Sequence, residues 1–313
     1  MIRTERLCKD YDGFAAVKDV TLHVEPGEIY GFLGPNGAGK TTIILMLLGI
    51  EKPTKGRIFL FGQPLQENYF RLKHRVGVLG ERQYIYDDMT AREYLRFFAG
   101  LYQVKEKDRR IEALLEAVGL RHFGEVRARD YSRGMQQKLG LVRALLHDAD
   151  LLILDEPVSG LDPHGILEVR HLIQEQNRRG RTVFISSHIL SEVERTAHRV
   201  GIIHHGVLMA EDSLDNLRSR LRQQVELEVE LQEVQPGLVE SLSGLEFVRE
   251  VAIKDNKLTL KLDAATDFRP QVFATISACG GVIVEMRTKE MSLEEAFVTI
   301  TERNVSLLAG SEE

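Results

Sequence analysis

The segment GPNGAGKT at residues 34–41 has the spacing G-x-x-x-x-G-K-[ST] of a phosphate-binding loop. Glycines permit positive φ, so successive backbone N–H groups can turn toward one anion at the start of a helix. Lys40 is placed to reach the β- and γ-phosphates, and Thr41 to ligate Mg²⁺. The residues predicted to contact phosphate are Gly34, Pro35, Asn36, Gly37, Ala38, Gly39, Lys40, Thr41 and Thr42.

Two adjacent carboxylates end the apolar segment LLILDEP at residues 151–157. A run that is apolar on both faces suits a central parallel strand, and open α/β sheets bind ligands at the carboxyl ends of such strands. We expect Asp155 to hold the metal ion and Glu156 to orient or deprotonate an attacking water. A strand that merely stops at a solvated turn is the alternative, which the phosphate-binding loop disfavours.

A histidine follows a second β-branched segment. Residues 182–187 read TVFISS, a strand ending in small polar residues, and His188 comes next. A lone histidine after a strand is more often structural than catalytic. Its place on the strand after the Asp155 strand nevertheless allows contact with a γ-phosphate.

Local signals indicate the elements that position these groups. A turn signal at residues 25–28 precedes the apolar run 29–33, which predicts a buried strand before the loop. Residues 41–48 are apolar and end near Gly49, as a helix would. Strand, glycine loop and helix are the context that a phosphate-binding loop requires.

Composition limits the class of protein. The 313 residues are enough for a large domain and a smaller one, and 43% hydrophobic with 28% charged residues is ordinary for a globular protein. There is no apolar run of about 18 residues and no signal-peptide core, and the two cysteines suggest no metal site or disulfide framework, so we expect a cytosolic protein. Residues 221–313 carry a net charge of −8 and residues 1–220 one of +2, so we expect no nucleic-acid partner.

Two further segments and two single residues carry a family resemblance. YSRGMQQK at 131–138 matches a signature usually written Leu-Ser-Gly-Gly-Gln, and residues 159–162 resemble the D-loop that follows it. His188 matches the family's switch histidine, and Tyr11 the aromatic residue that stacks on adenine. Over residues 1–215 the chain resembles the nucleotide-binding subunit of an ATP-binding cassette (ABC) transporter. The ordered set of motifs makes this resemblance specific.

The resemblance implies a fold, cofactors and partners. The fold is the α/β P-loop NTPase ABC cassette, with a mainly parallel core sheet, an antiparallel subdomain and a helical subdomain at about residues 83–145. ATP and Mg²⁺ are the implied ligands. Two copies of the chain would sandwich ATP, with Ser132 and Gly134 of one copy facing the γ-phosphate held by the other. A separate transmembrane permease would place the chain at the cytoplasmic face of the membrane, as a peripheral subunit.

Three departures from the family pattern narrow the resemblance. Where the family has a Q-loop glutamine, this chain has Glu81, followed by Gln83. Glu81 can still reach Mg²⁺ through water, but it adds negative charge. Arg133 and Met135 replace a glycine and a glutamine of the signature. This variant resembles the subset that serves ABC-2-type exporters of drugs, peptide antibiotics, polysaccharides or ions.

Two aromatic positions have more than one interpretation. Tyr84, Ile85 and Tyr86 precede a capping box at residues 90–93, in a predicted loop. They are either a buried part of the loop or the surface where the family's permease docks. Tyr11 is either the adenine platform or a half-buried aromatic residue at a strand end, and Phe14 is the alternative platform.

The chain after residue 215 carries no catalytic constellation. Strands are predicted at 225–231, 246–253, 257–262 and 281–286. A helix at 268–277 and a capping box at 292–295, which opens a last helix, complete a small split-βαβ arrangement. We expect an accessory α+β domain at 216–305 and a disordered tail at 306–313. Regulation and bracing of a dimer are both open as its role.

Two other functional classes fit the sequence less well. A soluble ABC ATPase acting on nucleic acid or the ribosome usually has a coiled-coil insertion or two cassettes, whereas this chain has one phosphate-binding loop and no sustained heptad run. A nucleotide-gated switch without turnover is disfavoured by the intact pair Asp155–Glu156. The sequence therefore favours an ATPase that drives transport.

Overall fold

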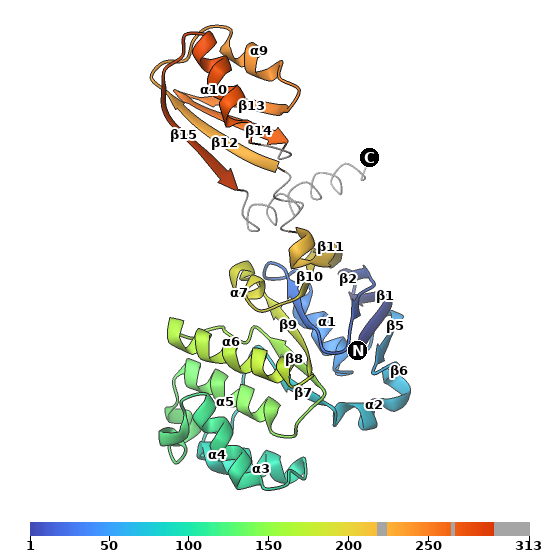
Figure 1. Cartoon of the computed structure of the whole chain (residues 1–313). Helices are drawn as coiled ribbons and strands as arrows, with labels where there is room; N and C mark the ends of the chain where they lie inside the picture. The colour runs from blue at the N-terminus through green and yellow to red at the C-terminus, as the bar shows by residue number, and fades with distance from the viewer. Residues whose placement is uncertain (218–223, 264–266, 291–313) are drawn as a thin grey trace. The chain divides into compact units, whose positions relative to one another are not determined.

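The computed structural model describes residues 1–217, 224–263 and 267–290, and it divides the chain into two compact units, Met1–Asp212 and Ser213–Glu313 (Figure 1). The first unit is built on a six-stranded sheet with the order β11-β10-β4-β9-β8-β7. Its strands are β4 (Ile29–Leu33), β7 (Val76–Leu79), β8 (Leu151–Asp155), β9 (Thr182–Ser187), β10 (Arg199–His204) and β11 (Val207–Ser213).

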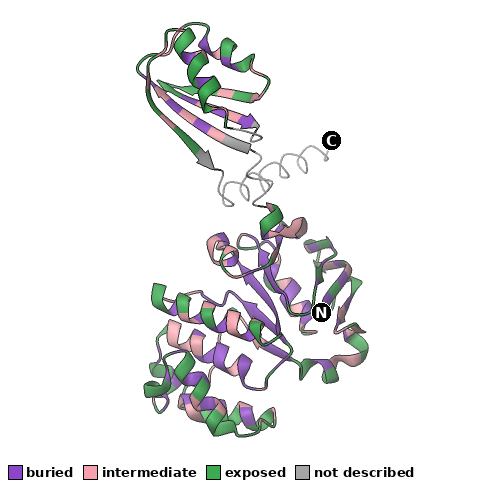
Figure 2. Ribbon diagram, viewed as in Figure 1, coloured by how far each residue is buried: buried purple, intermediate pink, exposed green. Residues whose placement is uncertain are grey.

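The strands from β10 to β7 are parallel. Every residue of β4, β8 and β9 is buried, as expected for central strands covered on both faces (Figure 2). Because these three strands are neighbours in the sheet, their carboxyl ends bring residues 34–41, Glu156 and His188 to one edge.

A second sheet and two helices complete the half of this unit that contains residues 34–41. The second sheet is formed by β1 (Ile2–Tyr11), β2 (Phe14–Val20), β3 (His23–Val24), β5 (Lys55–Leu60) and β6 (Gln63–Pro64), and its strand pairs are antiparallel. Helix α1 (Lys40–Leu47) lies between the two sheets, packed on β2 and β8 in one hydrophobic core (Figure 1). Helix α2 (Leu65–Lys73) packs on β5 and β6.

Helices on the other side of the central sheet include the predicted helical subdomain. They are α3 (Ala91–Leu101), α4 (Lys107–Ala117), α5 (Arg133–Leu145), α6 (Pro163–Arg178) and α7 (Leu190–Glu194), with 3₁₀ turns at Arg121–Phe123 and Ala128–Asp130. The predicted capping box starts α3: the Thr90 hydroxyl accepts from the Glu93 N–H at 3.2 Å, and the Glu93 carboxylate accepts from the Thr90 N–H at 2.8 Å. None of the described helices has the length and apolar character needed to cross a membrane.

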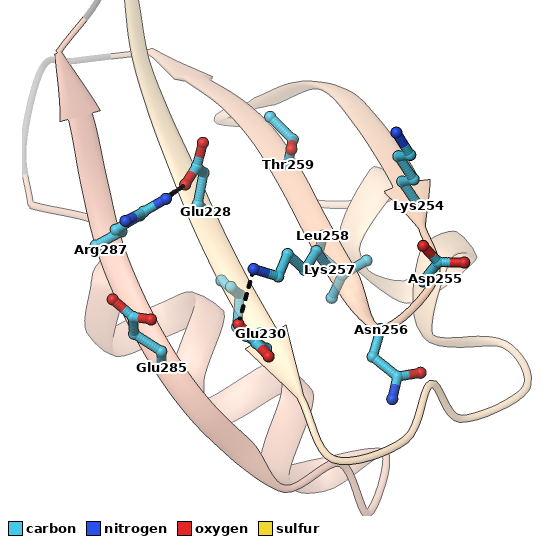
Figure 3. A pocket seen from close by; sticks show the side chains of 11 residues that line it. Glu228, Glu230, Lys254, Asp255, Asn256, Lys257, Leu258, Thr259, Glu285 and Arg287 are labelled. Carbon is cyan, nitrogen blue, oxygen red and sulfur yellow. Dashed lines mark hydrogen bonds and ion pairs between the residues drawn. The ribbon is translucent and has the colours of Figure 1, made fainter.

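The second unit has the predicted split-βαβ order in its described part. Its elements are β12 (Gln224–Leu231), α9 (Leu238–Ser243), β13 (Val248–Lys254), β14 (Lys257–Asp263), α10 (Arg269–Ala278) and β15 (Ile283–Glu290). The sheet order is β13-β14-β12-β15, all antiparallel. One face packs against α9 and α10, while the other carries cross-strand ion pairs such as Glu228–Arg287 and Glu230–Lys257 (Figure 3). The helix predicted from Ser292 and the tail at 306–313 lie outside the described residues.

Candidate active site

The loop between β4 and α1 has the geometry of an anion site. Gly37 and Gly39 have φ of 79° and 103°, so both use the left-handed freedom that the motif predicts. A Cβ on Gly39 would also lie 2.7 Å from the Ala16 carbonyl oxygen. Helix α1 has no side-chain cap and no acidic residue in its first turn. Its first N–H groups therefore remain free to bind a negative group.

Lys40 brings the positive charge of this loop to the acid pair. Its ammonium donates to the carbonyl oxygens of Gly34 at 2.6 Å and Pro35 at 3.2 Å, and lies 3.5 Å from Glu156 Oε1. His188 approaches the same carboxylate from β9, with Nδ1 2.9 Å from Glu156 Oε2. Lys40 and Glu156 are both buried. The structure therefore groups a cation, a carboxylate and an imidazole around one point beside the loop.

Asp155 lies at the end of β8 next to Thr41. The Thr41 hydroxyl donates to Asp155 Oδ2 at 3.2 Å, and the Ser186 hydroxyl donates to Asp155 Oδ1. Burial raises the pKa of Asp155 above its ordinary value of 3.8, although these two hydrogen bonds oppose that rise. The charges of Glu81 and Glu156 raise this pKa further. A buried carboxylate in this state gains stability from a nearby cation.

These oxygens suit Mg²⁺. The Thr41 hydroxyl and the Asp155 carboxylate are adjacent oxygen donors beside the phosphate-binding loop. In the described part of the chain, no cluster of three His, Cys, Asp or Glu residues could hold a metal ion. In phosphoryl-transfer sites Mg²⁺ is commonly bound through one or two carboxylates together with phosphates of the substrate. Glu81 is exposed, and its predicted contact with Mg²⁺ through water remains a prediction.

The two candidate adenine platforms lie together. Tyr11 ends β1 and Phe14 begins β2, and they are partners in the antiparallel register. Tyr11 is 40% exposed and Phe14 is 68% exposed, so both residues are partly open to solvent. The Lys9 ammonium lies 4.7 Å from the centre of the Tyr11 ring. The two residues predicted as alternative adenine platforms therefore lie opposite each other on the two strands of one hairpin.

The signature segment begins α5. Ser132 is the N-cap of α5, and its hydroxyl accepts from the Met135 N–H at 3.2 Å. Helix α5 packs on α3, α4 and β7, whereas α1 packs on β2 and β8. The Arg133 guanidinium, in place of a signature glycine, lies 3.5 Å from the Ser159 hydroxyl. The predicted contact of Ser132 and Gly134 with the nucleotide of a second copy remains a prediction.

Two residues at the site were not predicted from the sequence. Ser186 bonds both to the Asp155 carboxylate and to the Glu156 N–H, the latter at 3.1 Å. The side-chain amide of Gln137 donates to the Glu156 carbonyl oxygen at 3.0 Å. The small polar end of β9 was a signal for Ser186. Gln137 lies within the signature segment, but its sequence position does not indicate which way its side chain points.

The ABC transporter family model matches residues 17–159. The chain is 46% identical over 230 residues to the bacitracin transport ATP-binding protein BcrA of Bacillus licheniformis, with 73% of this chain and 75% of that protein covered. It is 41% identical over 298 residues to BcrA of Enterococcus faecalis, with 95% of each chain covered.

A solved structure described as the ATP-binding subunit of an ABC transporter superposes on this chain with a TM-score of 0.66. The two sequences are 32% identical, and the superposition covers 70% of this chain and 92% of the other.

Proposed function

The chain belongs to the ABC transporter family of ATP-binding proteins, and we propose that it binds and hydrolyses ATP to power an exporter whose permease is a separate chain. The observation that carries this proposal is the meeting of Lys40, Glu156 and His188 beside the Thr41–Asp155 pair. These groups provide what phosphoryl transfer to water needs: a charge clamp, a metal-binding pair and a base.

The chemistry is mainly positioning and charge stabilisation. Lys40 and the N–H groups at the start of α1 would bind the phosphates, and Thr41 and Asp155 would hold Mg²⁺, which supplies charge neutralisation when bound. Glu156 accepts a proton from the attacking water or orients it. His188, bonded to Glu156 in the structure, steadies that carboxylate and lies where it can contact the γ-phosphate.

Two copies of the chain form the working enzyme in this proposal. Ser132 caps α5, and the first turn of that helix contains no acidic residue, so the positive end of the helix dipole there can attract an anion. The γ-phosphate bound by the partner's loop is the proposed occupant. A two-fold arrangement then builds each site from both chains.

The permease is proposed to dock on an exposed aromatic surface, defined here as Tyr84, Tyr86 and Phe97. These side chains are 85%, 53% and 48% exposed, which removes the buried-loop interpretation for the two tyrosines. The rings of Tyr86 and Phe97 meet edge to face with centroids 6.0 Å apart. Exposed aromatic residues in a group are typical of protein interfaces. Docking there would hold the chain at the cytoplasmic face of the membrane.

The relatives narrow the class of exporter. Both of those described above are bacitracin transport ATP-binding proteins, and they match this chain over most of its length. We therefore favour efflux of a peptide antibiotic or a similar amphipathic compound.

Phosphate release by the purified chain tests this proposal. We expect ATP hydrolysis that needs Mg²⁺ and stops with EDTA. Lys40→Ala removes the only side-chain cation of the loop, so it should abolish nucleotide binding or hydrolysis while thermal unfolding stays cooperative. Equal nucleotide affinity and equal hydrolysis in wild type and Lys40→Ala would show that the loop is not the site. Binding without any turnover in the wild type would instead indicate a nucleotide-gated switch.

A further inference from the structure

The backbone of Glu156 has a conformation that its local sequence opposes. Its φ is 49°, in the left-handed region that residues other than glycine seldom adopt. Pro157 follows, and a residue before proline prefers an extended backbone. Contacts with distant parts of the chain must therefore hold Glu156 in place. One of them comes from β9, where the Ser186 carbonyl oxygen accepts the Glu156 N–H at 3.2 Å.

The second contact comes from α5. Gln137 is 5% exposed, and its side-chain Nε2 donates to the Glu156 carbonyl oxygen at 3.0 Å. The Ser159 N–H donates to the same carbonyl at 3.0 Å from the following turn. This carbonyl belongs to the peptide that joins Glu156 to Pro157, so its direction sets ψ of Glu156. Gln137 therefore acts on a backbone torsion of the residue that carries the catalytic carboxylate.

A second side-chain amide, that of the half-buried Gln83, lies next to the first. Gln83 Nε2 donates to the Gly80 carbonyl oxygen at 2.6 Å and lies 3.5 Å from Gln137 Oε1. The carbonyls of Gly80 and Glu156 can only accept, so they fix the orientation of both amides. A Cβ on Gly140 would overlap the Gln83 amide, so the glycine makes room for it. Gln83 Oε1 is buried and has no hydrogen-bond partner in the described structure.

We propose that Gln137 is a positioning residue for hydrolysis: it holds the Glu156 peptide in the left-handed conformation that aims the carboxylate between Lys40 and His188. Gln83 holds Gln137 in turn. The segment that begins at Gly80 and leads into the exposed aromatic surface is thereby joined to the catalytic carboxylate by two amides. The inference rests on the proposed ATPase function, which it deepens.

The test uses the full chain and the variant Gln137→Met, which keeps the side-chain volume and removes the donor. Misplacement of a catalytic group costs up to about 100-fold in rate, so we expect kcat to fall about 10- to 100-fold. The KM for ATP and the affinity for a fluorescent ATP analogue should not change, because the phosphate-binding loop is untouched. A fall in nucleotide affinity that accounts for the lost rate would overturn the proposal.

Gln176→Met is the matched control. Gln176 is 2% exposed and accepts a hydrogen bond from Arg181, away from the site. Loss of a buried glutamine that has only a structural role should lower the melting temperature and leave kcat unchanged. Equal kcat in wild type, Gln176→Met and Gln137→Met would overturn the inference while leaving the ATPase function standing. Absence of hydrolysis in all three would reject the proposed function itself.

A double-mutant cycle separates positioning from general damage. If Gln137 acts through Glu156, adding Gln137→Met to Glu156→Gln should change the residual turnover by less than about 2-fold. Two losses that multiply would contradict this. Gln83→Met should lower kcat in the same direction and add little in the presence of Gln137→Met. Gln83→Met also keeps the proposal testable if Gln137→Met does not fold. In that case, a wild-type kcat in Gln83→Met would refute the proposed chain of two amides.

Discussion

His188 Nδ1 lies 2.9 Å from Glu156 Oε2, although the two residues are 32 positions apart in the sequence. The contact joins the ends of β8 and β9, which are neighbours in the parallel sheet. The opposite oxygen of the carboxylate, Oε1, faces the Lys40 ammonium at 3.5 Å. Each side of Glu156 thus has its own partner, which keeps the carboxylate oriented toward the phosphate-binding loop.

Glu156→Gln should retain ATP binding and lose turnover. The substitution keeps the shape of the side chain and removes the base, a change expected to cost about 10²–10⁴-fold in kcat. ATP that is bound but not cleaved should then hold the two copies together, which size-exclusion chromatography can measure. Glu28→Gln is the control, because Glu28 is a buried carboxylate that pairs with Arg199 just before β4, at the opposite end of that strand from the phosphate-binding loop. Turnover near wild type in Glu156→Gln would reject the assignment.

Ser132→Arg tests whether each site is shared between two chains. The variant should bind ATP as a monomer but fail to dimerise with ATP or to hydrolyse it. In a mixture with Lys40→Ala, each heterodimer collects both defects in one site and leaves the other intact. When the two variants are mixed in equal amounts, the mixture should therefore have about a quarter of the active sites of the same amount of wild-type protein. The ATPase rate is measured against mixing ratio at constant total protein.

A site confined to one chain predicts no recovery at any mixing ratio. A rate that stays at background would therefore contradict the shared site, provided that a tagged pull-down shows heterodimers. Wild type mixed with Lys40→Ala provides the reference for the yield of mixed dimers.

Asp155→Asn should stabilise the fold at neutral pH while it impairs Mg²⁺-dependent hydrolysis. Burial raises the pKa of Asp155 above 3.8, so the folded state favours the neutral carboxyl. That contribution to stability is present at low pH and is lost as pH rises through the raised pKa. The gain in melting temperature from Asp155→Asn, measured without Mg²⁺, should be largest near pH 7 and shrink toward about pH 4.

Asp267→Asn is the control for that experiment, because we expect it to change stability in the opposite direction. Hydrogen bonds from Arg269 lower the pKa of Asp267 to about 2, so its contribution to stability is present at neutral pH and lost at lower pH. The residue is exposed, so the substitution should produce only a small loss of stability near pH 7. A lower melting temperature for Asp155→Asn than for wild type at pH 7 would contradict the prediction for the buried site.

The double variant Tyr84→Ala/Tyr86→Ala should separate docking from catalysis. Both rings are exposed, so ATP hydrolysis by the isolated chain should stay within about 2-fold of wild type. Co-purification with the permease from detergent extracts should be lost. Phe70→Ala is the control, since Phe70 is 74% exposed on α2 and lies outside the proposed surface. Equal recovery of the permease with both variants would place the docking site elsewhere.

The local elements of the site follow from the sequence. The glycine spacing at 34–41 predicted the loop and the helix after it, and the capping box at Thr90 predicted where α3 begins. The apolar runs before Asp155 and His188 predicted two central strands, which the structure contains as β8 and β9. Such signals span few residues, because they report backbone preferences and the periodicity of burial. The family resemblance that these motifs carried is confirmed by the comparisons.

Contacts between distant segments needed the tertiary structure. Sequence position alone did not predict that Ser186 and Gln137 contact the backbone of Glu156. It also did not predict that His188 contacts the Glu156 carboxylate. The conformation of Glu156 runs against its local sequence, because a residue before proline prefers to be extended whereas its φ is 49°. Hydrogen bonds with β9, with α5 and with the Ser159 N–H of the following turn hold Glu156 in that conformation. The sequence by itself determined which groups are available for chemistry, and the packing of remote elements decided how they are aimed.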